Sequence, residues 1–273
     1  MLTFPLLLVL CLFFSTIMTG LLKRYGQSRL LDQPNHRSSH QVPTPRGGGM
    51  AIVATFLLAA PLFVTLIPLP AGISQSSFAL IWAAALGIAL VGFIDDHISL
   101  KPRTRLIVQS MAAALVVSAV DGLPALTFFG WQLDLAWFGY LLAWLGVIWF
   151  INLYNFMDGI NGITGVYSLV MLITFYYINQ YGVAFTDAHF IIYPILASLV
   201  FLFFNFRKRA KCFAGDVGSM SIAFWVLALL GLLMVKTEDF TYLLFIAVYG
   251  IEVISTILQR IKLKENIFEA HRH

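Results

Sequence analysis

The sequence has few charged residues and few cysteines, and each shortage narrows the class of protein. Only 11% of the 273 residues are charged, whereas soluble domains average about 25%. Hydrophobic residues make up 60% of the chain and the mean hydropathy is +0.87, so we expect a polytopic membrane protein. The two cysteines lie in an apolar run and in a basic loop, which gives no sign of a disulfide framework.

Long apolar runs follow one another along the chain and predict an all-α helical bundle. A helix needs about 20 mostly apolar residues to cross a bilayer. The first run has no positive segment ahead of it and no clear cleavage signature after it, so we expect a retained span and not a signal peptide. Residues 1–273 are expected to form one integral membrane domain. The nine predicted spans are 2–22, 47–69, 78–94, 106–120, 135–151, 164–181, 191–204, 220–235 and 241–259.

Positive charge gathers in alternate loops and predicts the orientation. The loops 23–46, 95–105, 152–163, 205–219 and 260–273 hold 16 of the 17 Lys and Arg residues. Because positively charged loops stay in the cytoplasm, we place these five segments inside and the N-terminus outside. Glu252 is the acid within a predicted span, where it either lines an active cleft or pairs with a neighbouring polar group.

The stretch Asn152-Leu-Tyr-Asn-Phe-Met-Asp-Gly-Ile-Asn-Gly162 is a polar segment between two apolar runs. Its polar side chains Asn152, Asn155, Asp158 and Asn161 follow one another at intervals of three. Residues three apart share a helix face, so these groups should converge. Carboxylates and amides at the edge of hydrocarbon are costly unless they bind a ligand. The alternative is a polar loop whose two glycines cap helices.

Asp95 and Asp96 are adjacent carboxylates at the end of the third predicted span. Two such groups repel each other unless a cation or a proton lies between them. They are candidates for holding Mg²⁺, which binds carboxylate oxygens together with substrate phosphates, or for a general base. The alternative is a solvated acidic helix end that is balanced by Lys101, Arg103 and Arg105.

Two glycine-containing segments open predicted spans. Three glycines follow Arg46 and would let a phosphate approach the backbone and the helix N-terminus; a hinge or a packing patch is the alternative. In the turn Gly-Asp-Val-Gly-Ser at 215–219, the glycines leave room for a metal beside Asp216. Four basic residues precede this turn and suit nucleotide or lipid phosphates, although the positive-inside rule explains part of their charge. The terminal His271 and His273 either contact phosphate or face solvent.

These segments together resemble the polyprenyl-phosphate N-acetylhexosamine-1-phosphate transferase superfamily (glycosyltransferase family 4), which includes MraY-, WecA- and WbpL-like enzymes. The resemblance covers nearly the whole chain and depends on four motifs in order. They are Pro-Arg-Gly-Gly-Gly at 45–49, Gly-Phe-Ile-Asp-Asp at 92–96, the asparagine-rich stretch, and Gly-Asp-Val-Gly-Ser at 215–219. The resemblance implies an α-helical inner-membrane enzyme of ten or eleven spans.

The resemblance also assigns roles to residues. Asp95 and Asp96 would serve magnesium and activate the lipid phosphate, with Asp95 as the expected base, and Asp158 would be a third catalytic residue. Asp216 would be the metal-binding aspartate, with Mn²⁺ as a substitute for Mg²⁺. The implied substrate-binding residues are Asn152, Asn155, Asn161, Asn205, Lys211, Phe213, Arg46, Gly48, His271 and His273.

The chain departs from the family pattern at two places. Asn161 stands where many members have a second aspartate, and the form Asp-Gly-Ile-Asn-Gly is expected of WbpL-like enzymes of O-antigen synthesis. The sequence also ends within the family's histidine motif, where at least one further span is expected, so we expect either a truncated chain or an unusual member of the family.

The predicted function is transfer of an N-acetylhexosamine 1-phosphate from a UDP-sugar to undecaprenyl phosphate, with release of UMP, at the cytoplasmic face of a bacterial inner membrane. The sugar is expected to be of the N-acetylglucosamine, N-acetylfucosamine or N-acetylquinovosamine type. The expected partners are the two substrates, the lipid bilayer and a second copy in a homodimer, but no nucleic acid. The alternatives are phospho-N-acetylmuramoyl-pentapeptide transfer, an ion-coupled transporter that uses Glu252, and a scaffold subunit.

Overall fold

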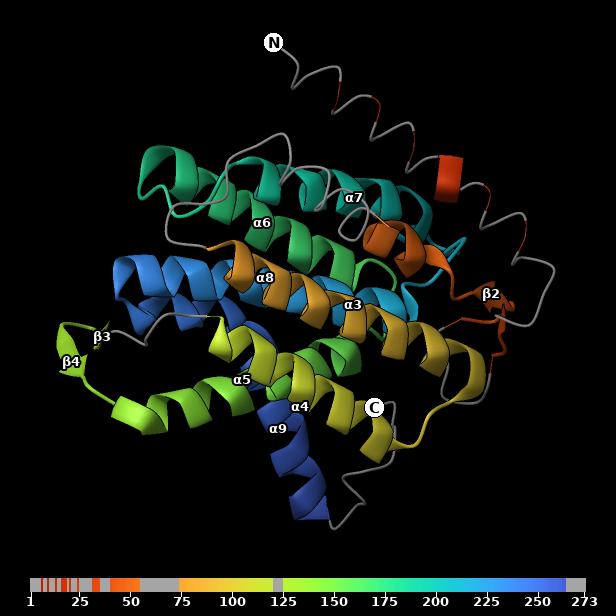
Figure 1. Cartoon of the computed structure of the whole chain (residues 1–273). Coiled ribbons are helices and arrows are strands. Elements are labelled where there is room, and N and C mark those ends of the chain that lie inside the picture. The colour runs from red at the N-terminus through yellow and green to blue at the C-terminus, as the bar shows by residue number, and fades with distance from the viewer. Residues whose placement is uncertain are drawn as a thin grey trace.

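The structure is a computed structural model that describes residues 31–34, 40–54, 74–119 and 125–263, together with a few scattered residues before position 31. Most of its long helices have roughly parallel or antiparallel axes, whereas the last helix lies obliquely to them, as Figure 1 shows. The helices are α3 (Gln75–Ile98), α4 (Pro102–Ser118), α5 (Ala136–Met157), α6 (Ile163–Tyr181), α7 (His189–Asn205), α8 (Gly215–Thr237), η1 (Phe240–Ile246) and α9 (Ala247–Leu263). Two antiparallel ladders accompany them: β1 (Leu31–Asp32) with β2 (Thr44–Pro45), and β3 (Leu126–Phe128) with β4 (Trp131–Leu133).

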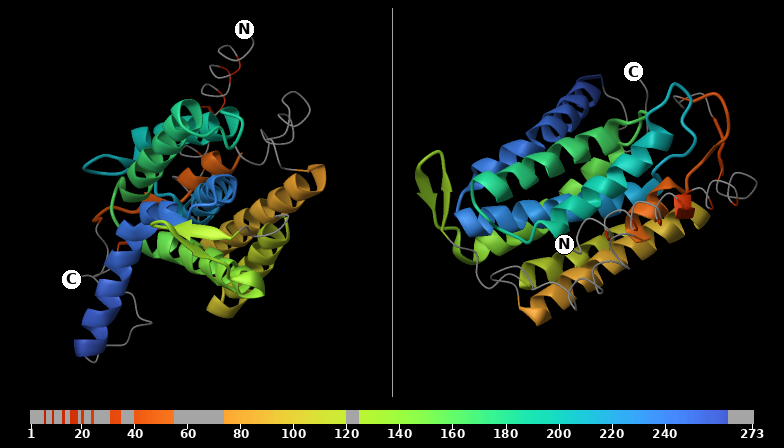
Figure 2. Two further views of the ribbon diagram at one scale, coloured as in Figure 1. Left: turned by 90° about the vertical axis from the view of Figure 1, so that its left-hand side faces the viewer. Right: turned by 90° about the horizontal axis from the view of Figure 1, so that it is seen from above.

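Helix α8 occupies the centre of the bundle. It packs against α3, α5, α6 and η1, and Figure 2 shows these neighbours on several sides of it. All of its residues from 217 to 226 are buried. A helix that is apolar on every side is typical of such a central position.

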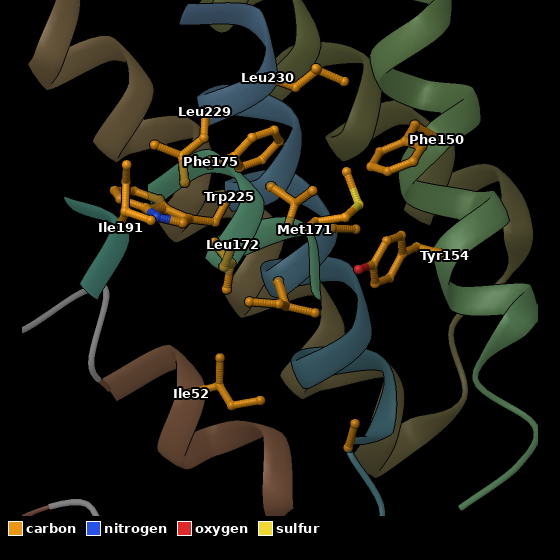
Figure 3. Close-up of a cluster of buried hydrophobic side chains, with 14 of the residues drawn as sticks. Ile52, Phe150, Tyr154, Met171, Leu172, Phe175, Ile191, Trp225, Leu229 and Leu230 are labelled. Carbon is orange, nitrogen blue, oxygen red and sulfur yellow. The ribbon is translucent and has the colours of Figure 1, made fainter. Parts of the chain in front are cut away.

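Apolar side chains from the five helices α5, α6, α7, α8 and α9, together with Ala51 and Ile52, contribute to the main core. Figure 3 shows part of it, with Phe150, Tyr154, Met171, Phe175, Ile191, Trp225 and Leu229 among the labelled residues. The polar atoms of its aromatic residues have partners, since Trp225 Nε1 donates to Phe190 O at 3.0 Å and the Tyr154 and Ser168 hydroxyls lie 2.7 Å apart. In a bilayer, such a cluster stabilises the bundle mainly through close packing, because lipid is as apolar as these side chains.

The prediction of a helical membrane protein is confirmed. The seven predicted segments from 78–94 to 241–259 are helical. In the described part of the chain, four helices are long and apolar enough to cross a membrane, namely α3, α5, α8 and the continuous segment Phe240–Leu263. Residues 48–54 of the second predicted span are helical, while the rest of it and most of the first lie outside the described residues. The count of nine spans and their orientation therefore stay predictions.

Two features of the fold differ from the sequence prediction. Helices α3 and α5 extend beyond the predicted apolar limits, and their last turns are residues 95–98 and 152–157, which include Asp95, Asp96, Asn152 and Asn155. They continue because neither extension contains a glycine or a proline to end the helix. The hairpin of β3 and β4 lies in a segment predicted as a loop, and its turn residues Phe129 and Gly130 both have positive φ, at 48° and 84°.

The helix ends that carry the predicted cytoplasmic loops meet at one end of the bundle. Asp96 at the end of α3 accepts a hydrogen bond from the first turn of α8, and Asn205 at the end of α7 accepts one from Gly162 before α6. Gly48 donates to Phe213 O at 3.0 Å and joins residues 48–54 to the loop before α8. Loops that are distant in sequence are thus adjacent in space.

The close approach of α3 to α8 depends on Gly92. A Cβ atom at this position would lie 2.7 Å from Val217 Cα and 2.8 Å from Asp216 O, which is closer than carbon atoms tolerate. Only glycine lets the two helices pack at this distance, and the packing brings Asp96 to the start of α8.

We predict that Gly92→Ala lowers the free energy of unfolding by about 1–3 kcal/mol, because the added methyl group overpacks the contact between α3 and α8. Thermal unfolding of the purified protein in detergent measures the change. Gly87→Ala on the same helix is the matched control, since the nearest atom to its Cβ would be Val108 Cγ1 at 3.9 Å. The free energy of unfolding of the control should stay the same or rise by up to about 1 kcal/mol, because alanine favours a helix more than glycine does. An equal decrease in both variants would contradict the packing role of Gly92.

Candidate active site

A cavity of about 300 Å³ lies where these helix ends meet. Its lining residues come from four of the five predicted cytoplasmic segments. They are Asp32, His40, Arg46, Asp96, Asn155, Asp158, Gly159, Ile160, Asn161, Asn205, Phe213, Gly215 and Asp216. Four carboxylates and several amides in one cavity form a site for a cation and for polar or phosphorylated ligands.

Asp96 is held against the N-terminus of α8. Its carboxylate accepts hydrogen bonds from Asp216 N at 2.9 Å and Val217 N at 3.1 Å, and the positive end of the helix dipole favours its charge. Gly215 makes this contact possible, because its φ is +69° and a Cβ there would lie 2.5 Å from Asp96 Oδ2. The contact places the Asp96 carboxylate beside Asp216 on the wall of the cavity.

Asp95 has different surroundings from its neighbour. It is buried and does not line the cavity. Its carboxylate accepts hydrogen bonds from Leu100 N at 2.5 Å and from Arg105 Nη1 at 2.8 Å. Its side chain also contacts that of Asp216, which lines the cavity. Adjacent residues on a helix are about 100° apart, so Asp95 and Asp96 point in different directions. The role of Asp95 as the base stays a prediction.

Asp158 is the residue that follows the last turn of α5, and it lines the cavity. Burial raises the pKa of its carboxyl from an ordinary value of 3.8 to about 6. The nearby Thr164 hydroxyl opposes this shift, and the charge of Asp96 adds to it. A carboxyl with a pKa of about 6 can exchange a proton near neutral pH.

The asparagines of the polar segment separate into two groups. Asn155 and Asn161 line the cavity, where Asn155 Oδ1 accepts from Ser219 Oγ at 2.9 Å and Asn161 Nδ2 donates to Arg207 O at 3.0 Å. Asn152 lies outside it, because its Nδ2 donates to Gln109 Oε1 at 2.6 Å on α4. The prediction that all four polar side chains converge is wrong for Asn152, since each step of three residues turns a side chain by about 60° around the helix.

Asn205 lines the cavity, but its amide is used within the chain. Its Oδ1 accepts from Gly162 N at 2.6 Å, and its Nδ2 donates to Cys212 O at 2.9 Å. These bonds join the end of α7 to the start of α6 and to the loop before α8. The structure thus gives Asn205 a positioning role beside any contact with substrate.

Of the three glycines that follow Arg46, Gly48 has a role in packing and not in contact with a phosphate. It does not line the cavity, its N–H is bonded to Phe213 O, and a Cβ there would lie 2.8 Å from Cys212 Sγ. Arg46 does line the cavity and donates to Asp32 Oδ1 at 2.5 Å.

The remaining predicted substrate-binding residues are divided. Phe213 lines the cavity, and His40 packs edge-on against its ring with the centroids 4.9 Å apart. Lys211 is exposed and outside the cavity. His271 and His273 lie outside the described residues.

Five residues with polar side chains around the site were not predicted as site residues: Asp32, His40, Arg105, Gln109 and Ser219. Gln109 and Ser219 are polar residues at or within the apolar spans, and this isolation is the signal that could have found them. The other three carry no such signal, because charged residues are common in cytoplasmic loops.

The cavity was also predicted to hold Mg²⁺. Among the described residues, no three His, Cys, Asp or Glu side chains are arranged to hold a metal by themselves. Mg²⁺ is usually bound by one or two carboxylates together with water and substrate phosphates. Asp96, Asp158 and Asp216 offer this donor chemistry in one cavity, so these residues fit such an ion.

Comparison with known proteins gives a family match and several relatives. Residues 78–235 match the family described as glycosyl transferase family 4. A probable undecaprenyl-phosphate N-acetylglucosaminyl 1-phosphate transferase of Bacillus subtilis is 28% identical over 264 residues, which cover 92% of this chain and 70% of the relative. A phospho-N-acetylmuramoyl-pentapeptide-transferase of Streptococcus agalactiae is 30% identical over 250 residues, covering 86% and 71%. An undecaprenyl-phosphate alpha-N-acetylglucosaminyl 1-phosphate transferase of Yersinia pestis is 33% identical over 212 residues, covering 72% and 54%.

The raised pKa of Asp158 predicts a pH-dependent gain in stability for Asp158→Asn. Below about pH 4 Asp158 is protonated in the folded and the unfolded protein, so its stabilising contribution is complete. As the pH rises through about 6, the Asp158 carboxyl of the folded protein must carry its charge in buried surroundings. The free energy of unfolding of the wild type then falls by up to about 3 kcal/mol. The variant should therefore unfold at a higher temperature than the wild type at pH 7.5, and the difference should vanish near pH 4.

Thermal unfolding in detergent with a chelator tests this prediction, since a bound cation would itself stabilise the charge. Glu238→Gln, which removes an exposed carboxylate outside the cavity, is the control and should behave as the wild type at both pH values. A difference between wild type and Asp158→Asn that does not change with pH would exclude a buried charge as its cause.

Proposed function

The chain belongs to glycosyl transferase family 4, and from this premise we propose that it transfers an N-acetylhexosamine 1-phosphate from a UDP-sugar to undecaprenyl phosphate, releasing UMP. The observation that supports the proposal most strongly is the convergence of Asp96, Asp158 and Asp216 on one cavity at one end of the bundle. The reaction brings two anionic phosphates together, and a carboxylate-lined cavity that fits a divalent cation meets this need.

The position of the cavity suits both substrates. The basic loop of Arg207, Lys208, Arg209 and Lys211 lies next to it and is exposed. Exposed apolar side chains, Phe206 at 66% and Ile160 at 66%, accompany this loop. A bilayer-embedded lipid phosphate and a soluble nucleotide sugar would meet at such a boundary between basic and apolar surface. Arg46, on the cavity wall, is the basic residue we assign to substrate phosphate.

Three aspartates of the cavity have different roles in the proposed reaction. Asp216, with help from Asp96, would hold Mg²⁺, which when bound neutralises the charge that develops on the phosphoryl oxygens. Asp158 takes the role of base in place of Asp95, because it faces the cavity and Asp216 and Asp96 are assigned to the cation. Burial raises the pKa of Asp158 and that of Asp96 to about 6, so the assignment depends on position and not on the pKa. Asn155 and Asn161 would orient the substrate from the same wall.

Asp158 accepts the last proton of the lipid phosphate, and an oxygen of that phosphate attacks the phosphorus that carries the sugar. The bond from this phosphorus to the oxygen of the uridine-linked phosphate breaks, and UMP leaves with the bonding electrons. A two-step route through an aspartyl phosphate is the alternative mechanism.

The choice of sugar is part of the proposal. We propose an N-acetylglucosamine-type substrate, or a 6-deoxy relative of it, for O-antigen or another envelope polysaccharide, on the basis of the Asp-Gly-Ile-Asn-Gly segment that carries Asn161. Phospho-N-acetylmuramoyl-pentapeptide transfer, the activity in the name of the Streptococcus agalactiae relative, is the competing candidate. A panel of UDP-sugars that includes the muramoyl-pentapeptide substrate distinguishes them.

A transporter that uses Glu252 has less support. Glu252 is exposed on α9 and does not line the cavity. The carboxylates that do line it lie at the helix ends, whereas an ion relay would place them along the spans.

We predict that Asp96→Asn, Asp158→Asn and Asp216→Asn each lower the rate of transfer by about 100-fold or more, because each removes a metal ligand or the base. Glu252→Gln should retain the wild-type rate. The measurement is UMP release by purified protein with undecaprenyl phosphate and the UDP-sugar panel, with Mg²⁺, with Mn²⁺ and with a chelator. Near-normal rates in all three Asn variants, or equal rates with the chelator, would end the proposal.

A further inference from the structure

Arg105 joins two carboxylates that come from different helices. Its Nη1 lies 2.8 Å from Asp95 Oδ2, on α3, and 3.4 Å from Asp216 Oδ2, on α8. The two contacts differ in exposure, since 5% of the Asp95 side chain and 28% of the Asp216 side chain are accessible. The shorter ion pair is therefore the buried one, and the longer one is formed with the carboxylate that faces the cavity.

No second basic side chain of the described residues forms an ion pair with Asp216. The other basic residue near the aspartates, Arg46, pairs with Asp32. Arg105 does not line the cavity, so it reaches Asp216 from behind the cavity wall. It therefore occupies one side of the carboxylate that the proposed cation would share.

The backbone of α4 fixes the position of Arg105. Pro102 begins the helix, and Leu100 donates its N–H to Asp95 just before it. One turn after Arg105, the buried Gln109 exchanges hydrogen bonds with Asn152 on α5 and contacts Met220 Sδ on α8. Gln109 thus anchors this part of α4 to two helices, and the ion pairs of Arg105 place its guanidinium between α3 and α8.

We propose that Arg105 is a positioning residue that competes with the divalent cation for Asp216, and that Asp95 limits this competition by holding the guanidinium. This inference depends on the proposed function, because it assumes that Asp216 is the metal ligand. The pair of Arg105 and Asp95 orients the Asp216 carboxylate toward the cavity while the cation is absent. When a cation binds, the weaker contact at 3.4 Å is the one that is replaced.

The proposal gives Asp95 a new role. Asp95 becomes the residue that retains Arg105 in its buried pair, which explains why it is excluded from the cavity although it neighbours Asp96 in sequence. Two substitutions should then change metal affinity in opposite directions. Arg105→Gln removes the competing charge, and Asp95→Asn releases that charge toward Asp216.

The test is binding of Mn²⁺ to the full chain in detergent, followed through the electron paramagnetic resonance signal of the free ion, with no substrate present. We expect Arg105→Gln to bind Mn²⁺ about tenfold more tightly than the wild type or better, because a positive charge next to the site is gone. Asp95→Asn should bind at least about threefold more weakly. Arg105→Lys, which keeps the charge, should stay within about threefold of the wild type. Any Mn²⁺ that still binds to Asp216→Asn is bound outside the proposed site, so this variant gives the background.

The opposite signs separate a positioning role from a structural one, since mere loss of structure would weaken metal binding in both variants. Equal or weaker binding by Arg105→Gln, with an unfolding temperature close to that of the wild type, would overturn the proposal. If Arg105→Gln does not fold, the Mn²⁺ affinity of Asp95→Asn provides the test. An affinity equal to that of the wild type would then overturn the proposal. UMP release by the wild type is measured in parallel. Absence of release refutes the proposed function, whereas release together with unchanged Mn²⁺ affinity refutes the role of Arg105 alone.

Discussion

The Asp96 carboxylate bound to the first backbone N–H groups of α8 is the interaction on which the site depends. It joins the end of α3 to the start of the central helix, and it satisfies two N–H groups that would otherwise have no partner within the helix. Two glycines allow it: Gly92 lets the helices approach, and Gly215 leaves room for the carboxylate. The same contact places Asp216, in the first turn of α8, beside the Asp96 carboxylate of α3.

Around this contact, polar side chains bind one another where they do not face the cavity. Gln109 and Asn152 pair across α4 and α5, and Asn205 joins α7 to α6. Unpaired polar groups are costly in a bilayer, so these pairs stabilise the helix ends and leave Asp158 and Asp216 as the groups turned toward a ligand. The apolar core shown in Figure 3 lies behind them and supports the same helices.

Much of this arrangement could be predicted from the sequence, and the failures have a common cause. Apolar runs located the helices, and the cost of acids at the membrane boundary identified Asp96, Asp158 and Asp216. Sequence spacing does not reveal how each helix is rotated, so the positions of Asp95 and Asn152 outside the cavity could not be predicted. Nor could the close approach of helices, which gives Gly48 its packing role. Arg105 has the composition of any basic loop, and only its contacts with two carboxylates distinguish it.

We propose that a cation held by Asp216 and Asp96 lies in the cavity that Asp158 also lines. Crystals of the protein grown with Mn²⁺ and a UDP-sugar provide the test, because anomalous scattering locates the metal without reference to any assumed mechanism. We expect one strong anomalous peak bonded to Asp216, next to Asp96 and within the cavity lined by Asp158. A peak bonded to Asp95 but remote from Asp216, or strong peaks only outside the cavity, would contradict it.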